Sequence, residues 1–146
     1  MPETTSPSQR FKELREQAGL SREEAASRMG ISSPSVWDIE AFADELTSCY
    51  SPSQVRRFCE SMGARPLDLF GMSTEPAVSA GELADRIRAE CRKRNITLEQ
   101  FEDAVGWKLS ECLEPPERLL EDMTLDGLQW LCRELGIDWH RVIMSL

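Results

Sequence analysis

The feature that constrains this chain most is a helix-start pattern that recurs along its length. A Ser or Thr followed three residues later by Glu or Gln forms a capping box, because the two side chains bond to free backbone N–H groups of a helix's first turn. The pattern occurs at residues 6–9, 21–24, 51–54, 79–82 and 97–100. Apolar residues spaced three and four apart follow these starts, and no stretch alternates convincingly with period two. The sequence therefore predicts an all-α protein.

The chain also repeats itself in two separate blocks. The segment GLSREEAASRMGI at 19–31 aligns with NITLEQFEDAVGW at 95–107, and VRRFCESMGARPLDLF at 55–70 aligns with LQWLCRELGIDWHRVI at 128–143. Few residues are identical, but the apolar positions and the turn glycines recur in the same order. We interpret the repeat as two copies of one helical unit.

The repeat predicts the domain organisation. We expect a disordered N-terminal segment at 1–7, a first unit at 8–70, and a second, degenerate unit at 82–146. The segment GMSTEPAVSAG at 71–81 is rich in small and turn residues, so it is the predicted linker. The predicted fold is two tandem five-helix units.

The charge of the chain is strongly negative. The net charge is −9, from 17 Lys and Arg against 26 Asp and Glu. The excess is spread over both halves, with 8 basic and 12 acidic residues up to Pro76, and 9 and 14 after it. Phosphate contacts dominate DNA affinity, so this balance argues against DNA binding unless one face is locally basic.

Several classes of protein find no support in the sequence. No apolar run reaches membrane-spanning length, and MPETTSPSQ lacks the blocks of a signal peptide, so we expect a cytoplasmic protein without a membrane partner. The five cysteines, an odd number without a Cys-x-x-Cys, are expected to be small buried side chains. The chain has no phosphate-binding loop, no nucleophile–His pair and no metal-ligand spacing, so we expect neither an enzyme nor a metal or cofactor.

The first copy resembles the lambda-repressor-like, or XRE-type, helix-turn-helix family. The pattern lies in FKELREQAGLSREEAASRMGISSPSVWDIE followed by SPSQVRRFCESMGARPLDLF, over about residues 8–70, with a degenerate second copy at about 80–146. The resemblance implies a first helix at 8–18, a second after a Ser21 cap, and a third, recognition helix at 33–40. It also implies a DNA-binding transcription regulator.

The residues that would contact DNA follow from the resemblance and from helix geometry. Val36 and Ile39 are three apart and share a face, which we expect to be buried. The outer positions of the recognition helix then face solvent. The predicted DNA-binding residues are Arg22, Ser32, Ser33, Ser35 and Trp37.

A second hypothesis is an acidic protein-binding module on the same fold, related in role to antitoxins, immunity proteins or anti-repressors. The outer face also holds Pro34, and the segment AFADELTSCY brings three acids where a DNA-binding loop would supply a cation. The residues for this alternative are Trp37, Asp38, Asp44 and Glu45. Its partner would be a basic or apolar protein surface, and both hypotheses stay open at this stage.

The second copy departs further from the family pattern. Glu102 aligns with Ala26, a small residue at a close helix crossing, and Pro115 and Pro116 are expected to end the third helix early. We therefore expect this copy to keep the fold but not to contact DNA. Only one recognition helix would be intact, so a palindromic operator would require a homodimer.

Overall fold

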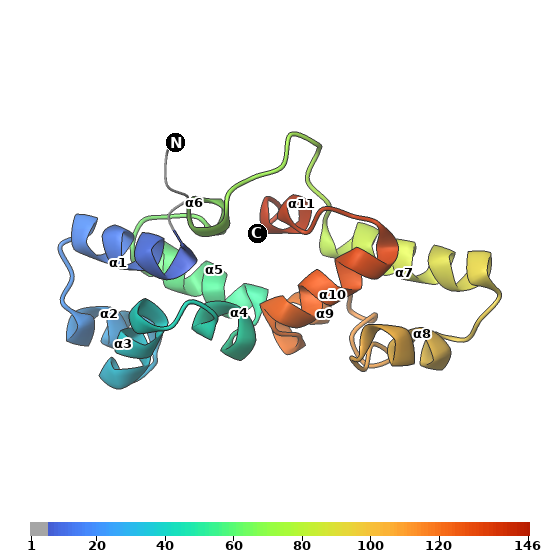
Figure 1. The fold of residues 1–146 in the computed structure, drawn as a ribbon, viewed down its shortest axis with the longest axis horizontal. Helices are drawn as coiled ribbons and strands as arrows, with labels where there is room; N and C mark the ends of the chain where they lie inside the picture. The colour runs from blue at the N-terminus through green and yellow to red at the C-terminus, as the bar shows by residue number, and fades with distance from the viewer. Residues whose placement is uncertain (1–5) are drawn as a thin grey trace.

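The computed structural model describes residues 6–146, and these residues form an all-α protein (Figure 1). The first unit contains α1 (Pro7–Gln17), α2 (Arg22–Met29), α3 (Ser33–Ala41), α4 (Glu45–Cys49), α5 (Pro52–Ser61) and α6 (Pro66–Phe70). The second contains α7 (Ala80–Arg94), α8 (Leu98–Val105), α9 (Arg118–Asp122), α10 (Leu125–Leu135) and α11 (His140–Ile143). Over 6–146 there are eleven helices and no strand, which confirms the predicted all-α class.

The capping boxes start the helices where the sequence predicted them. Four of the boxes close in both directions, namely those that begin at Ser6, Ser21, Ser51 and Thr97. At the remaining start, the Ser79 hydroxyl accepts a hydrogen bond from the Glu82 N–H. The first box begins α1 at Pro7, inside the segment predicted as disordered; the rest of that prediction, residues 1–5, lies outside the described residues. Each cap stabilises its helix by about 1 kcal/mol.

The core of the first unit fixes the angle between α2 and α3. Ala25 and Ala26 are buried, and their small side chains let the two helices cross closely. Gly30 ends α2 with φ of 73°, a left-handed conformation that favours glycine. Val36 and Ile39 are fully buried, which confirms the predicted inner face of α3.

Two local features differ from the prediction. The segment after α3 contains an extra helix, α4, because the buried Leu46 packs one turn against the core. In the second unit, residues 107–117 form turns, so the expected short third helix does not form at all. The Glu102 carboxylate accepts hydrogen bonds from the N–H groups of Leu109 at 2.6 Å and Ser110 at 3.4 Å. Glu102 therefore stabilises turns in the second unit, whereas the small Ala26 at the aligned position of the first unit lets α3 pack closely on α2.

The two units pack against each other through α4–α6 of the first and α9–α11 of the second. In the structure α4 packs on α10, α5 on α9, and α6 on α11. On the predicted repeat, α5 aligns with α10 and α6 with α11, so these contacts have the pattern expected of an isologous dimer interface. Figure 1 shows the result, with α1 and α7 lying above α2, α3 and α8 at the two ends of the molecule.

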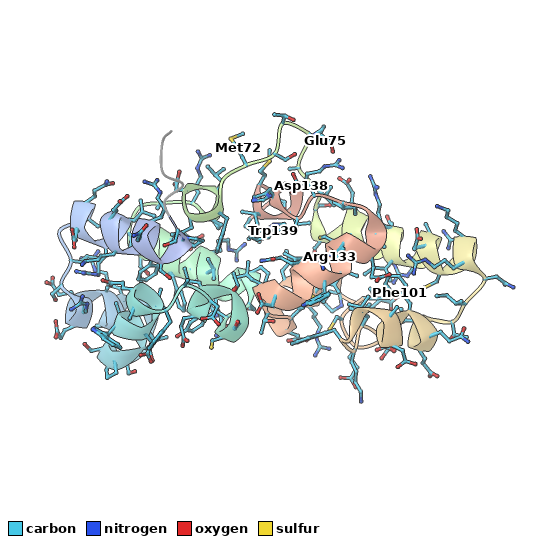
Figure 2. The ribbon with its side chains drawn as sticks, viewed as in Figure 1. Met72, Glu75, Phe101, Arg133, Asp138 and Trp139 are labelled. Carbon is cyan, nitrogen blue, oxygen red and sulfur yellow. The ribbon has the colours of Figure 1, made fainter. Side chains whose placement is uncertain are left out.

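Specific contacts hold this junction. The Leu125 N–H donates to the Tyr50 carbonyl at 3.1 Å, and the Ser48 hydroxyl donates to the Asp126 carboxylate at 2.7 Å. Trp139, which precedes α11 and is labelled in Figure 2, meets the ring of Phe70 edge to face, with centroids 5.3 Å apart.

The predicted linker, residues 71–81, packs along α11. Val78 is fully buried, and its N–H donates to the Arg141 carbonyl at 2.9 Å. The Arg141 side chain returns a hydrogen bond to the Pro76 carbonyl at 2.8 Å and pairs with Glu75 at 3.2 Å. These contacts tie the two units into one packed body.

The cysteines differ in their surroundings. Four are buried as predicted, but Cys49 at the end of α4 is exposed. Burial raises the pKa of the Cys59 and Cys132 thiols to about 12, so both stay protonated and unreactive at neutral pH.

Candidate nucleic-acid interface

The predicted recognition helix, α3, begins at a serine-capped turn. The Ser32 hydroxyl accepts a hydrogen bond from the Ser35 N–H at 3.2 Å, and the two hydroxyl oxygens lie 2.7 Å apart. Two of the predicted DNA-binding residues are therefore engaged in capping the helix. Ser33, at the first helical position, is half-buried at the surface.

The outer face of α3 forms a shallow hollow with the start of α2. It is lined by Arg22, Glu23, Ser33, Pro34, Trp37 and Asp38. The fold thus brings together Arg22, Ser33 and Trp37 of the predicted DNA-binding set. It also brings in Asp38 of the alternative set. Whether DNA or a protein contacts these residues stays a prediction.

Trp37 faces solvent, as the sequence predicted. Its side chain is 49% exposed, and the neighbouring Phe42 is 50% exposed. The two rings meet edge to face with centroids 5.9 Å apart, so the packing partner of Trp37 is Phe42 and not the second unit. Asp44 and Glu45 follow at the start of α4 and extend an acidic border beyond this aromatic pair.

A buried ion cluster behind α3 was missed in the sequence. Arg15 of α1 donates to both oxygens of Glu40, at 2.8 and 3.0 Å, and to the Leu20 carbonyl at 2.8 Å. The Arg15 and Glu40 side chains are only 9% and 3% exposed. The hydrogen bonds that Arg15 donates to the Glu40 carboxylate raise the pKa of Arg15, the largest effect among several. The sequence did contain a hint, because Arg15 stands four residues after the core residue Phe11 on the same helix face.

The same cluster positions Arg22. The Arg22 Nε lies 3.5 Å from a Glu40 oxygen, is buried, and has no hydrogen-bond partner within residues 6–146. The side chain is nevertheless 39% exposed. Glu40 therefore holds the stem of Arg22 against α3 while part of the guanidinium reaches the outer hollow.

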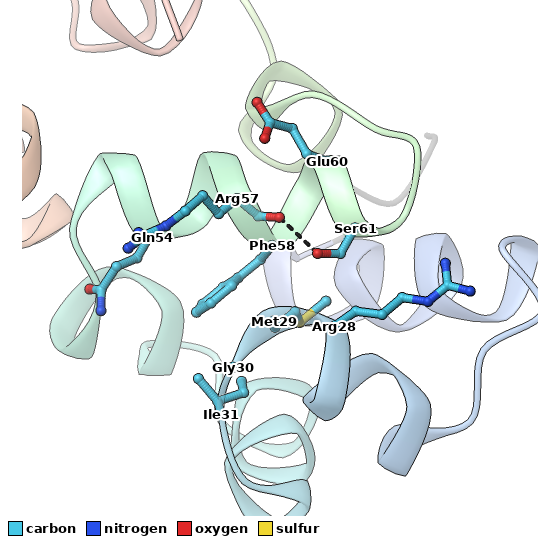
Figure 3. A pocket seen from close by; sticks show the side chains of 9 residues that line it. All are labelled: Arg28, Met29, Gly30, Ile31, Gln54, Arg57, Phe58, Glu60 and Ser61. Atoms are coloured by element: carbon cyan, nitrogen blue, oxygen red, sulfur yellow. Dashed lines mark hydrogen bonds between the residues drawn. The ribbon is translucent and has the colours of Figure 1, made fainter.

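Two further arginines lie beside the turn that precedes α3. Arg28 and Arg57 line a hollow between α2 and α5, together with Gly30 and Ile31 of the turn (Figure 3). Both are exposed, and neither forms an ion pair within the described part of the chain. Figure 3 shows Arg57 extending toward Gln54. With Arg22, they place three cations around this turn, beside the carboxylates Glu23, Asp38 and Glu60 that line the same two hollows.

The second unit offers no equivalent recognition surface. Leu109 and Leu113 align with Ser33 and Trp37, and both leucines are buried. Two of the four cations in the basic segment RAECRKR at 88–94 are paired: Arg88 lies 3.6 Å from Glu114, and Arg94 contacts Glu90 at 2.8 Å and Glu134 at 3.2 Å. These pairs favour a solvated, ion-paired surface over a phosphate-contacting strip.

The comparisons with known proteins agree with the geometry of the first unit. A family model described as a helix-turn-helix domain matches residues 8–70. This segment is therefore a helix-turn-helix domain, and it fits the lambda-repressor-like, XRE-type form. A helix-turn-helix domain indicates, in broad terms, a DNA-binding regulator. Searches among curated proteins and among solved structures gave no match. Within residues 6–146, no helix is long and apolar enough to span a membrane.

Proposed function

We propose that this protein is an XRE-type transcription regulator that contacts one DNA half-site through α3 of its first unit. The observation that supports this proposal is a complete helix-turn-helix whose outer face is free while its dimer-like face is covered by the second unit. In dimeric regulators of this kind, two recognition helices contact half-sites one helical turn apart. Here the second unit takes the partner's place but lacks a recognition helix, so a single chain serves one half-site.

The proposed contacts divide into positioning and base recognition. Arg22, Arg28 and Arg57 contact phosphates around the turn, which fixes the position of α3 in the major groove. Ser33 offers a hydroxyl to a base edge, and Trp37 offers apolar contact to a thymine methyl group. Asp38 repels phosphate but accepts a hydrogen bond from a cytosine amino group, which favours sites that present cytosine there.

A salt titration of binding to random-sequence duplex DNA tests the proposal. Three phosphate contacts predict that log K falls with log salt at a slope of about −2.7. Arg57→Ala should weaken binding to all sequences and reduce the slope by about 1. Lys93→Ala, a matched removal of an exposed cation on α7, should change neither. Absence of binding at low salt, both to random duplex and to a selected pool, would overturn the proposal.

A second candidate function has its own supporting observation. The exposed pair Trp37–Phe42 is bordered by Asp38, Asp44 and Glu45, and exposed aromatic side chains are frequent hot spots of protein interfaces. On this hypothesis the first unit binds a basic protein surface with an apolar centre.

The two candidates predict different results for the same variants. If the protein-binding hypothesis holds, Trp37→Ala abolishes capture of a partner, whereas Trp130→Ala, at the other highly exposed tryptophan, leaves capture intact. If DNA is the target, Trp37→Ala changes sequence preference and Arg57→Ala changes the salt slope. If Trp37→Ala alone abolishes capture of the partner and the wild type binds no DNA at any salt concentration, the surface is assigned to protein recognition.

A further inference from the structure

The second unit contains a hollow between the end of α8 and the start of α10. Two tryptophans, Trp107 and Trp130, line it together with the carboxylates Asp103 and Asp126. Trp130 is 55% exposed, although large aromatic side chains are normally placed in a core. Neither the helix-turn-helix match nor the proposed DNA contacts involve this hollow, which belongs to the second unit.

A glycine keeps the floor of the hollow open. Gly127 lies in the first turn of α10, and a Cβ there would stand 2.6 Å from the Met123 Cγ and 3.2 Å from the Trp107 Cε3. Any side chain at this position would displace the buried Met123 side chain and press on the Trp107 ring. The missing side chain thus lets the indole lie directly against the α10 backbone.

The chemistry of the lining fits an organic cation. The face of an indole attracts ammonium and guanidinium groups, and carboxylates beside it add charge attraction. Trp130 already attracts one such group, because the guanidinium of Arg133, also on α10 and labelled in Figure 2, lies 4.9 Å from the Trp130 ring centroid. Arg133 does not line the hollow, so it leaves the hollow's side of the ring free.

The neighbouring charges strengthen this fit. An adjoining hollow shares Asp103 and Trp107 and adds Glu99 and Glu102, with Lys108 as its one cation. Glu102 is already bonded to backbone N–H groups of the following turn, whereas Asp103 lines both hollows and Asp126 accepts one hydrogen bond, from Ser48. Two carboxylates and two indoles around one hollow, with Glu99 in the adjoining one, favour a positively charged group with an apolar body.

We propose that this hollow binds a small organic cation with a quaternary ammonium or guanidinium head group. The head group lies against the indole faces and pairs with Asp103 and Asp126. Asp126 also accepts a hydrogen bond from Ser48, on α4 of the first unit, at 2.7 Å. The ligand therefore shares the Asp126 carboxylate with the junction between the units, where Ser48 of α4 also binds it. The binding site itself does not depend on the proposed DNA function.

The test is a fluorescence titration of the full chain with choline and with arginine methyl ester. The neutral isostere 3,3-dimethylbutan-1-ol, which has the shape of choline without its charge, is the ligand control. The cations should quench tryptophan emission saturably, and the isostere should bind about three- to thirtyfold more weakly, the range expected for loss of a cation–π contact. Equal binding of the isostere, or no saturable change with either cation, would overturn the proposal.

Variants assign the signal to the hollow. Trp130→Leu should abolish saturable quenching, and Asp126→Asn should weaken cation binding, whereas Trp37→Leu, an equally exposed tryptophan on the first unit, should leave the affinity unchanged. Ser48→Ala should tighten cation binding about two- to fivefold, because the Asp126 carboxylate loses a competing donor. An unchanged affinity in both Trp130→Leu and Asp126→Asn would contradict the assignment even if the wild type binds.

Discussion

Substitution of Glu40 by alanine tests the idea that a buried ion cluster sets the position of the recognition helix. Glu40 is 3% exposed and accepts two hydrogen bonds from Arg15, which is itself 9% exposed. Glu40→Ala leaves this guanidinium buried with only the Leu20 carbonyl as an acceptor, and it also releases the stem of Arg22. Removal of one partner from a buried pair costs about 3–5 kcal/mol, because the remaining charge stays desolvated.

Thermal and urea unfolding followed by circular dichroism measures this cost. For a chain of this size, about 3–5 kcal/mol corresponds to a fall in Tm of roughly 6–20 °C. Glu16→Ala is the matched control, because Glu16 also approaches Arg15, at 3.9 Å, but is 57% exposed. Pairs at the surface contribute about 0–1 kcal/mol, so this control should lie near the wild type.

A double variant separates charge from packing. Arg15→Met combined with Glu40→Leu removes both charges and fills the space with apolar atoms, and such exchanges are often neutral or stabilising. We therefore expect the double variant to be more stable than Glu40→Ala. If the free energy of unfolding of Glu40→Ala lies within about 1 kcal/mol of the wild-type value, the Arg15–Glu40 pair does not hold α3 in place and the reasoning is refuted.

Three further predictions follow from local features. Gly127→Ala should lower the free energy of unfolding by about 1–3 kcal/mol because the added methyl group has no room. Gly81→Ala in α7, where the methyl group would lie an ordinary 3.9 Å from the Ser79 hydroxyl oxygen, should raise it by about 0.5–1 kcal/mol, and urea denaturation compares the two variants. In the folded protein a thiol reagent should label Cys49 first, and the four buried thiols only after unfolding; Cys49→Ser should remove the first phase in a mass-spectrometric time course. Hydrogen bonds from His140 hold the pKa of the Asp138 carboxyl below its ordinary value, so the ionised carboxylate stabilises the folded protein at neutral pH and this contribution is lost as the pH falls below about 4. The difference in unfolding free energy between wild type and Asp138→Asn should therefore shrink over that range, and a constant difference would refute the assignment.

Local sequence signals predicted the helices well because their causes are local. The capping boxes at Ser6, Ser21, Ser51 and Thr97 close within one turn of chain, so no distant contact is needed to form them. The turn at Gly30 follows equally directly from the backbone freedom of glycine.

The candidate site was predicted only in part. The outward direction of Trp37 followed from helix periodicity, and the structure confirms it. Its contact with Phe42 did not follow, because Phe42 leaves the helix in an extended conformation that periodicity does not describe. Arg28 and Arg57 were also missed, since they come from different helices and gather only when α2 and α5 pack.

The second unit shows the same limit from the other side. The prolines at 115 and 116 predicted a shortened helix, but Glu102 decides the outcome by bonding to backbone N–H groups seven and eight residues later, which stabilises turns instead. Helix propensity describes each residue within its own helix, so it cannot show that a side chain such as Glu102 will hydrogen-bond to the backbone of a later loop.

The sequence by itself determined that the described residues form an all-α protein and where the helices with capping boxes begin, because capping and apolar periodicity act within a few residues. Tertiary structure alone decided that α4–α6 pack against α9–α11 and that Glu40 gathers Arg15 and Arg22 behind α3. It also created the indole-lined hollow beside Gly127. These features depend on contacts between segments far apart in the chain, and their free energy comes from burial and charge pairing that exist only after the helices pack.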